Sequence, residues 1–151
     1  MAFAEKTTIE VPKTRAEIEA LVVKYGATRF ASGWTEDGRA SISFACKGRL
    51  VRFTIQAPTV TESNRWANSQ RGYKSQSQRE AWIAQEQRRR WRCLLLAIKA
   101  KLEVVESGIA TFEEEFLAHI VTADNLTVYE QIKAAEANGT KMLAAVGEGA
   151  G

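Results

Sequence analysis

The stretch REAWIAQEQRRRWRCLLLAIKAKLEVVE, residues 79–106, decides the fold. It contains neither Gly nor Pro, and at 1.5 Å per residue it predicts one helix roughly 42 Å long. Apolar side chains recur every three or four residues along its second half: Trp91, Leu95, Ile98, Leu102 and Val105, with Cys93 and Leu96 beside them. This spacing is typical of a helix with one buried face, so we expect Trp91 to lie in the core.

The first half of the same stretch is basic. Its Arg88, Arg89, Arg90 and Arg92 point to several sides of a helix and cannot all face the core. Residues 65–101 contain ten Lys and Arg residues against two acids, while residues 107–151 contain two against seven. A basic middle and an acidic end favour a surface for a polyanion, or a contact between the two regions of neighbouring copies. A solvated charged face remains the alternative.

Three short alternating segments, 28–35, 39–46 and 49–57, predict an antiparallel meander before the helix. Lys47-Gly48 is a two-residue hairpin connection, and Glu36–Gly38 serves best as a three-residue loop with Gly38 in the left-handed region. The apolar pairs expected on the core face are Phe44 with Val51, Ile42 with Phe53, Ala40 with Ile55, Phe30 with Phe44 and Trp34 with Ala40. The opposite face is polar and slightly basic, as in a solvated sheet face.

Capping boxes mark three further helices. Thr14–Glu17, Thr111–Glu114 and Thr127–Glu130 each place a hydroxyl three residues before a carboxylate. They predict a helix that ends before Gly26, a short helix over 112–121 and a last helix that ends near 137. The fold class is therefore α+β in one domain, 1–151: an N-terminal helix, the three-stranded meander, a long helix packed across the sheet and two short C-terminal helices. Residues 1–11 and 139–151 are expected to fray.

The segment TVTESNRWANSQRGYKSQSQ, residues 59–78, is polar and lacks apolar periodicity. We interpret it as a mobile loop. Its basic residues Arg65, Arg71 and Lys74 alternate with Trp66 and Tyr73, a combination that suits single-stranded nucleic acid because rings stack on bases while cations follow phosphates. A surface loop whose tryptophan packs on the body is the alternative.

Composition excludes several classes of protein. The chain is 45% hydrophobic and 26% charged, as in an ordinary globular protein, and no apolar run approaches the ~20 residues of a membrane span. The N-terminus lacks the apolar segment of a signal peptide, and the two cysteines favour free thiols in a reducing cytoplasm. Glu115 and the single histidine, His119, make only two metal ligands. We expect no metal, no cofactor and no enzymatic activity.

The sequence also resembles a known group of proteins. Residues 17–28 (EIEALVVKYGAT), 48–53 (GRLVRF) and 88–121 (RRRWRCLLLAIKAKLEVVESGIATFEEEFLAHIV) are similar to a small, functionally uncharacterised protein family recurrent in bacteriophage and prophage genomes. Relatives often have a Pro-Asp-Gly turn where this chain has residues 122–125. The resemblance implies a phage context, hence the host cytoplasm, and no site residues. The predicted meander and long helix also look like the β-β-β-α core of single-strand annealing proteins, a topological analogy.

These observations predict a phage-encoded protein that binds, and anneals, single-stranded DNA in recombination. The expected contacts are Arg52, Arg65, Trp66, Arg71, Tyr73, Lys74, Arg79, Arg88, Arg89, Arg90 and Arg92. Basic residues 79–92 of one copy would meet acidic residues 113–136 of the next in a homo-oligomer. The alternative is a protein-binding module, such as an inhibitor of a host defence or replication protein.

Overall fold

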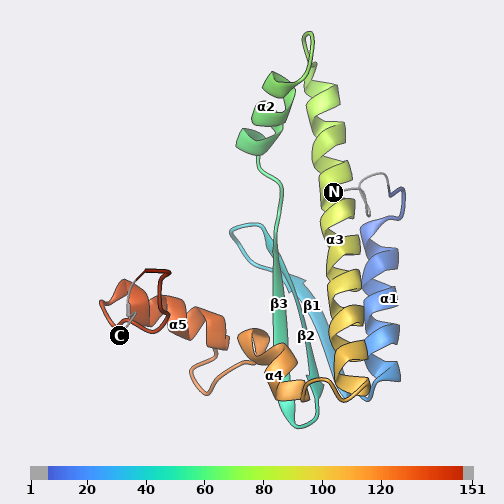
Figure 1. Ribbon diagram of the computed structural model, residues 1–151. Helices are drawn as coiled ribbons and strands as arrows, with labels where there is room; N and C mark the ends of the chain where they lie inside the picture. The colour runs from blue at the N-terminus through green and yellow to red at the C-terminus, as the bar shows by residue number, and fades with distance from the viewer. Residues whose placement is uncertain (1–6, 148–151) are drawn as a thin grey trace.

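The computed structural model describes residues 7–147 and confirms the α+β class (Figure 1). The elements are α1 (Val11–Lys24), β1 (Arg29–Trp34), β2 (Arg39–Cys46), β3 (Arg49–Gln56), α2 (Val60–Ser69), α3 (Gln76–Glu106), α4 (Phe112–Phe116), the 3₁₀ helix η1 (Leu117–His119) and α5 (Val128–Ala137). The 31 residues of α3 form the longest of them, and α1 lies alongside its second half (Figure 1).

The meander has the predicted register. Its strand order is β1-β2-β3, with Phe44 opposite both Phe30 and Val51, and Ile42 opposite Phe53. Lys47 (φ 53°) and Gly48 (φ 76°) both have positive φ, as a two-residue turn of type I′ requires. Gly38 has φ 80°, which confirms the three-residue first connection. Alternation therefore places one apolar face of the sheet toward the helices.

The core lies between that face and the helices α1, α3 and α4. Trp91, Ile98 and Leu102 of α3 are buried, and Leu95 and Val105 are partly buried beside them, which confirms the predicted stripe. Phe116 of α4 lies edge-on to Phe44 and Phe53, with ring centroids 6.2 and 6.3 Å apart. Aromatic packing thus joins the sheet to the chain that follows α3.

Two apolar side chains expected in the core lie outside it. Trp34 is 79% exposed because it ends the edge strand β1, where it lines only a small cleft with Val11 and Trp91. Leu96 is 41% exposed because it lies off the buried stripe of α3. Of the cysteines, Cys46 is buried and Cys93 is half-buried, and neither forms a disulfide.

Two of the three predicted capping boxes are confirmed. Thr111 and Thr127 each accept a hydrogen bond from a backbone N–H three residues later, at 3.1 and 3.2 Å. The first is wrong, because α1 begins three residues earlier at Val11, with Glu10 as its N-cap and Pro12 in its first turn. Thr14 is consequently a fully buried helical residue.

The largest difference from the sequence prediction lies in residues 59–78. Instead of one loop, residues 60–69 form α2, and α3 begins at Gln76 rather than at Arg79. The Thr59 hydroxyl accepts from the Glu62 N–H at 3.1 Å, and Ser75 and Gln78 form a full capping box. Polar helices with caps lack the apolar periodicity on which the loop prediction relied.

The chain after α4 also differs from the predicted helix over 112–121. The α-helix ends at Phe116, the 3₁₀ turn ends at His119, and Ile120 bridges to Val51 at the free edge of β3. The Val121 N–H donates to the Leu50 carbonyl at 2.8 Å. This pairing covers part of an open sheet edge and sets where α5 starts, which then extends on the side away from α1 and α3 (Figure 1).

The predicted frayed ends fall partly outside residues 7–147. Val11 belongs to α1, so the N-terminal boundary predicted at residue 11 is wrong. Residues 139–147 form no helix or strand. Among the residues described, no helix combines the length and the apolar character needed to cross a membrane.

The core assignment predicts unequal effects of two truncations in α3. Ile98→Ala should lower the free energy of unfolding by about 2–5 kcal/mol, because Ile98 is 0% exposed and its loss leaves a cavity. Leu96→Ala should cost less than about 1 kcal/mol, since Leu96 already meets solvent. Urea denaturation followed by circular dichroism measures both. Equal losses would contradict the assigned buried face.

Candidate nucleic-acid interface

The sequence-predicted basic and aromatic residues meet mainly on a helical hairpin. We call residues 59–83 the arm: α2, the turn at 70–75 and the first two turns of α3. The arm extends beyond the end of the sheet (Figure 1). Its outer part, residues 63–83, contains four Lys and Arg residues and a single acid, Glu80. The arm is therefore a basic projection from the body.

Two stacked tryptophans hold the arm together. Trp66 of α2 and Trp82 of α3 lie with ring centroids 5.8 Å apart and planes 19° from parallel. The Lys74 ammonium lies 6.0 Å from the Trp66 ring, and Arg79 donates to the Lys74 carbonyl at 2.6 Å. Trp66 and Arg79 thus brace the hairpin, and both are only partly exposed. Trp66 is accordingly not a loose loop residue.

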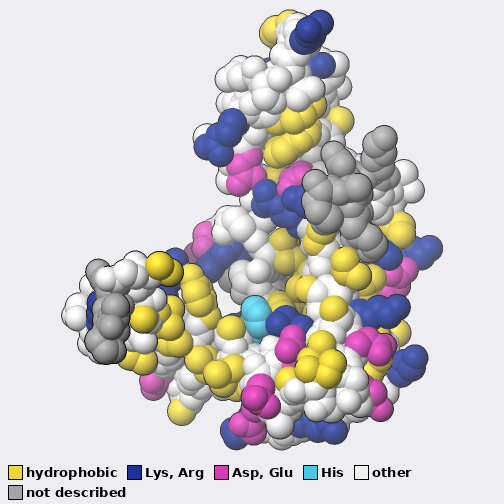
Figure 2. Space-filling view, in the orientation of Figure 1, with side chains coloured by type: hydrophobic (Ala, Val, Ile, Leu, Met, Phe, Trp, Pro, Cys, Tyr) yellow, Lys and Arg dark blue, Asp and Glu magenta, His cyan; other side chains and the backbone are white. Residues whose placement is uncertain are grey.

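The remaining predicted residues of this region lie at the outer end of the arm, where all but the half-buried Lys74 are exposed. We define the arm tip as Arg65, Arg71, Tyr73 and Lys74. Tyr73 is 85% exposed, and Arg65 and Arg71 are exposed as well. Among residues 7–147, no carboxylate pairs with the three cations of the arm tip. Figure 2 shows basic groups at the end of the arm and acidic groups where it joins the body.

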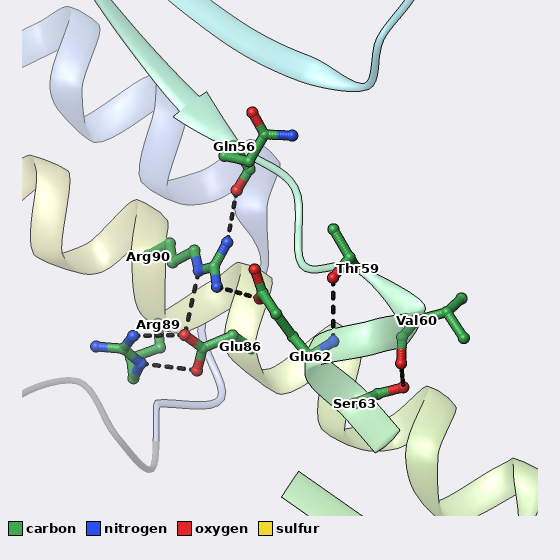
Figure 3. A network of polar contacts seen from close by, with 8 residues as sticks. All are labelled: Gln56, Thr59, Val60, Glu62, Ser63, Glu86, Arg89 and Arg90. Atoms are coloured by element: carbon green, nitrogen blue, oxygen red, sulfur yellow. Dashed lines mark hydrogen bonds and ion pairs between the residues drawn. The ribbon is translucent and has the colours of Figure 1, made fainter. Parts of the chain in front are cut away.

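Arg90 connects the base of the arm to the body (Figure 3). Its guanidinium donates to the Gln56 carbonyl at the end of β3 at 2.7 Å and to Glu62 of α2 at 2.6 Å. It also donates to Glu86 one turn earlier on α3 at 3.1 Å. The Arg90 side chain is 24% exposed. One side chain therefore joins three elements, and this fixes the angle at which the chain leaves the sheet.

Arg89 completes the same network from its other side. Its guanidinium donates to both oxygens of Glu86, with Nε 2.8 Å from Oε2. These bonds, and after them those from Arg90, lower the pKa of the Glu86 carboxyl against the opposing effect of burial, and the same pairing raises the pKa of Arg89. Glu86 is thus held ionised between two arginines.

The other arginines of this run attach α1 to α3. Arg92 donates to Glu17 and, at 3.4 Å, to the buried Thr14 hydroxyl. Arg88 lies 3.7 Å from Glu10, the N-cap residue of α1, and donates to Gln85 at 2.6 Å. Two arginines of the run therefore contact α1 or its N-cap, and the other two form the network at the base of α2. None of the four belongs to the arm tip.

Arg52 lies elsewhere again. It projects from the polar face of β3, where it donates to the Asn125 carbonyl at 2.8 Å and pairs with Glu130 of α5 at 3.3 Å. The hydrogen bonds of the Thr127 cap, and after them the pairing with Arg52, lower the pKa of Glu130 against the opposing effect of burial. Of the eleven predicted contact residues, the structure gathers Arg65, Trp66, Arg71, Tyr73, Lys74 and Arg79 on the arm and places the rest outside it.

Sequence reasoning missed the partners that hold the arginines. Glu62, Glu86 and Gln56 belong to three different elements, and no local pattern joins them. The helix α2 had a local signal: Thr59-Val-Thr-Glu62 has the form of a capping box, and so does Ser75-Gln-Ser-Gln78. Taken as helix caps, these two motifs predict a helical hairpin in place of the loop.

Comparisons with protein-family models, with curated proteins and with solved structures find no match to this chain. Across residues 7–147, no group of three or more His, Cys, Asp or Glu side chains is placed to hold a metal ion.

The Arg90 network predicts a local effect of one substitution. Arg90→Gln should speed amide hydrogen exchange in α2, because the arm loses about 1–2 kcal/mol of attachment to the body. Exchange in the buried part of α3, residues 98–105, should not change. Arg89→Gln is the matched control, because Arg89 touches Glu86 and Cys93 but neither Gln56 nor Glu62. Equal acceleration in both variants would contradict the role of Arg90.

The same network predicts an acid limit. Since the pKa of Glu86 is lowered on folding, its ion pairs contribute fully above the pKa of a free glutamate, about 4.3, and are lost as the pH falls through the folded value. NMR titration of the carboxyl carbon should therefore give a pKa below that of a free glutamate. Arg89→Gln should raise it more than Arg90→Gln. A larger increase of the Glu86 pKa in Arg90→Gln than in Arg89→Gln would contradict the assignment of Arg89 as the main partner of Glu86.

Proposed function

We propose that the protein binds single-stranded nucleic acid, DNA by preference, through the arm tip. The observation that carries the proposal is the combination at the end of the arm: three cations without carboxylate partners, the exposed Arg65 and Arg71 and the half-buried Lys74, beside a tyrosine ring that is 85% exposed. Cations in this state attract phosphates, and an exposed ring accepts an unstacked base.

Two further features support this use of the arm. Its shape is set by the tryptophan stack and by the Arg90 network, so the tip residues are presented by a braced hairpin rather than by a loop. Its polar composition leaves few apolar groups for a protein partner, although Val60 near its base is 69% exposed. A presented, charged projection favours a polyanion.

The arginines of α3 have a different part in this proposal. Arg88, Arg89, Arg90 and Arg92 are 18–30% exposed and have acidic partners in the chain, so contact with phosphate would require breaking those pairs. We assign them to supporting the arm and α1. Arg52 likewise supports α5.

A homo-oligomer through residues 79–92 and 113–136 stays a prediction, and three of its acidic groups already have partners in the chain: Glu113 with Arg49, Glu115 with Lys101 and Glu130 with Arg52. The phage context, the cytoplasmic location, a role in annealing and the absence of enzymatic activity are also still predictions. A protein-binding role for the arm is the outcome that the following test would favour if nucleic acid fails.

Neutralising the arm tip should weaken binding and flatten its salt dependence. In the triple variant Arg65→Gln, Arg71→Gln, Lys74→Gln, the slope of log K against log salt should fall by about 2, because each single-strand phosphate contact contributes about 0.7. Fluorescence anisotropy with a labelled single-stranded oligonucleotide over a salt series measures this slope.

The matched control removes the same charge elsewhere. Lys13, Lys24 and Lys99 are exposed and lie outside the arm. Changing these three to Gln should leave the slope nearly unchanged. If both triple variants lose the same slope, binding follows net charge and not the arm tip. If the parent protein binds no oligonucleotide at low salt, the proposal fails.

A further inference from the structure

A second candidate site lies away from the arm, where α5 leaves the sheet. A groove of about 640 Å³ separates the polar face of β2 and β3 from η1 and α5. Figure 2 shows the recess between the C-terminal helix and the body, and Figure 1 shows that α5 and the arm lie in different parts of the molecule. Its volume lies within the ~300–1,000 Å³ typical of small-molecule sites.

Cationic side chains from three elements line this groove: Arg39 of β2, Arg52 of β3 and Lys133 of α5. The one carboxylate in the lining, Glu130, is already paired with Arg52 at 3.3 Å. Arg39 is paired with Asp37, which lies outside the lining, with Nε 2.8 Å from Oδ2. No ion pair involves Lys133 among residues 7–147. The groove is therefore lined by three cations and one carboxylate, and Lys133 is the one of the three cations that has no acidic partner among residues 7–147.

A half-buried histidine also lines the groove. His119 stacks on Phe53, with ring centroids 4.1 Å apart. Burial, and secondarily Lys101, lowers the pKa of His119, so its imidazole is neutral at pH 7. Within the described chain its ring nitrogens make no hydrogen bond. Neither ring nitrogen is among the buried side-chain atoms that lack a partner, so both nitrogens are open to solvent or to a ligand in the groove.

The rest of the lining suits a ligand with a second, less polar part. Ala118, Ala134 and Ala137 form a smooth wall, Tyr129 adds a ring, and Thr54 and Thr127 add hydroxyl groups. We propose that the groove binds a phosphate monoester of mononucleotide size, with the phosphate near Lys133 and Arg39 and the planar part against His119 and Tyr129. Charge complementarity selects the phosphate, and the stacking surfaces select an attached ring.

This inference is independent of the proposed function. The arm tip and the groove share no residue, so each site has variants that leave the other intact. The arm-tip triple variant should keep its affinity for a nucleoside monophosphate. A groove variant should keep its affinity for the oligonucleotide. The two proposals can therefore fail separately.

Isothermal titration calorimetry with the full chain tests the groove. The probes are a nucleoside monophosphate, the matching nucleoside and inorganic phosphate. The nucleoside monophosphate should bind at least about tenfold more tightly than either part alone, because it engages both the cations and the stacking surface. Equal affinity for inorganic phosphate would overturn the assigned size, and no measurable binding of any probe at millimolar concentration would overturn the site.

Two variants locate the binding. Lys133→Gln should lower the affinity for the nucleoside monophosphate roughly tenfold, as expected when one charge-assisted hydrogen bond is lost. The control Lys99→Gln, an exposed lysine outside the groove, should not change the affinity. His119→Phe keeps a ring on Phe53 but removes both nitrogens, and should also weaken binding. Equal affinities for Lys133→Gln and Lys99→Gln would place the ligand elsewhere.

Discussion

The Arg90 guanidinium is the contact on which the arrangement of the arm depends. It joins the last carbonyl of β3, the Glu62 carboxylate of α2 and the Glu86 carboxylate of α3. Farther out along the arm, the Trp66–Trp82 stack holds α2 to α3. That stack involves no residue of the sheet, so it does not fix the position of either helix relative to the sheet. Within residues 7–147, the Arg90 contacts are the ones that connect the hairpin, the long helix and the sheet at one point.

Local charge explains why the basic run of α3 acts within the chain. Four arginines in five residues repel one another, and the fold offsets this by giving each an acidic partner: Glu10, Glu17, Glu62 or Glu86. Three of these carboxylates come from other helices, so the ion pairs act between elements. The cations of the arm tip have no such partner among residues 7–147, and residues 63–83 contain a single acid, Glu80. The cations available to bind a polyanion are therefore those at the end of the hairpin and not the arginines in the middle of α3.

The sequence was informative where the physics is local or periodic. The meander register followed from two turns and alternating apolar residues, and the α3 stripe from a period of three to four. The helix α2 was missed because its caps were overlooked in a polar segment. The partners of Arg90 could not be predicted, because an ion pair 28 positions apart and a hydrogen bond to a carbonyl 34 positions apart depend on tertiary geometry. The groove beside His119 was missed for the same reason, since it exists only once Ile120 pairs with β3.

The central claim is that the arm tip binds nucleic acid while the arginines of α3 support it. NMR chemical-shift mapping with a short single-stranded oligonucleotide tests this most directly, because it reports on every residue in one titration. The account predicts that amides of residues 65–74, and the Tyr73 ring, shift progressively to saturation while the side chains of Arg88, Arg89, Arg90 and Arg92 keep their resonances. Shifts centred on those four arginines, with the arm tip unchanged, would contradict it.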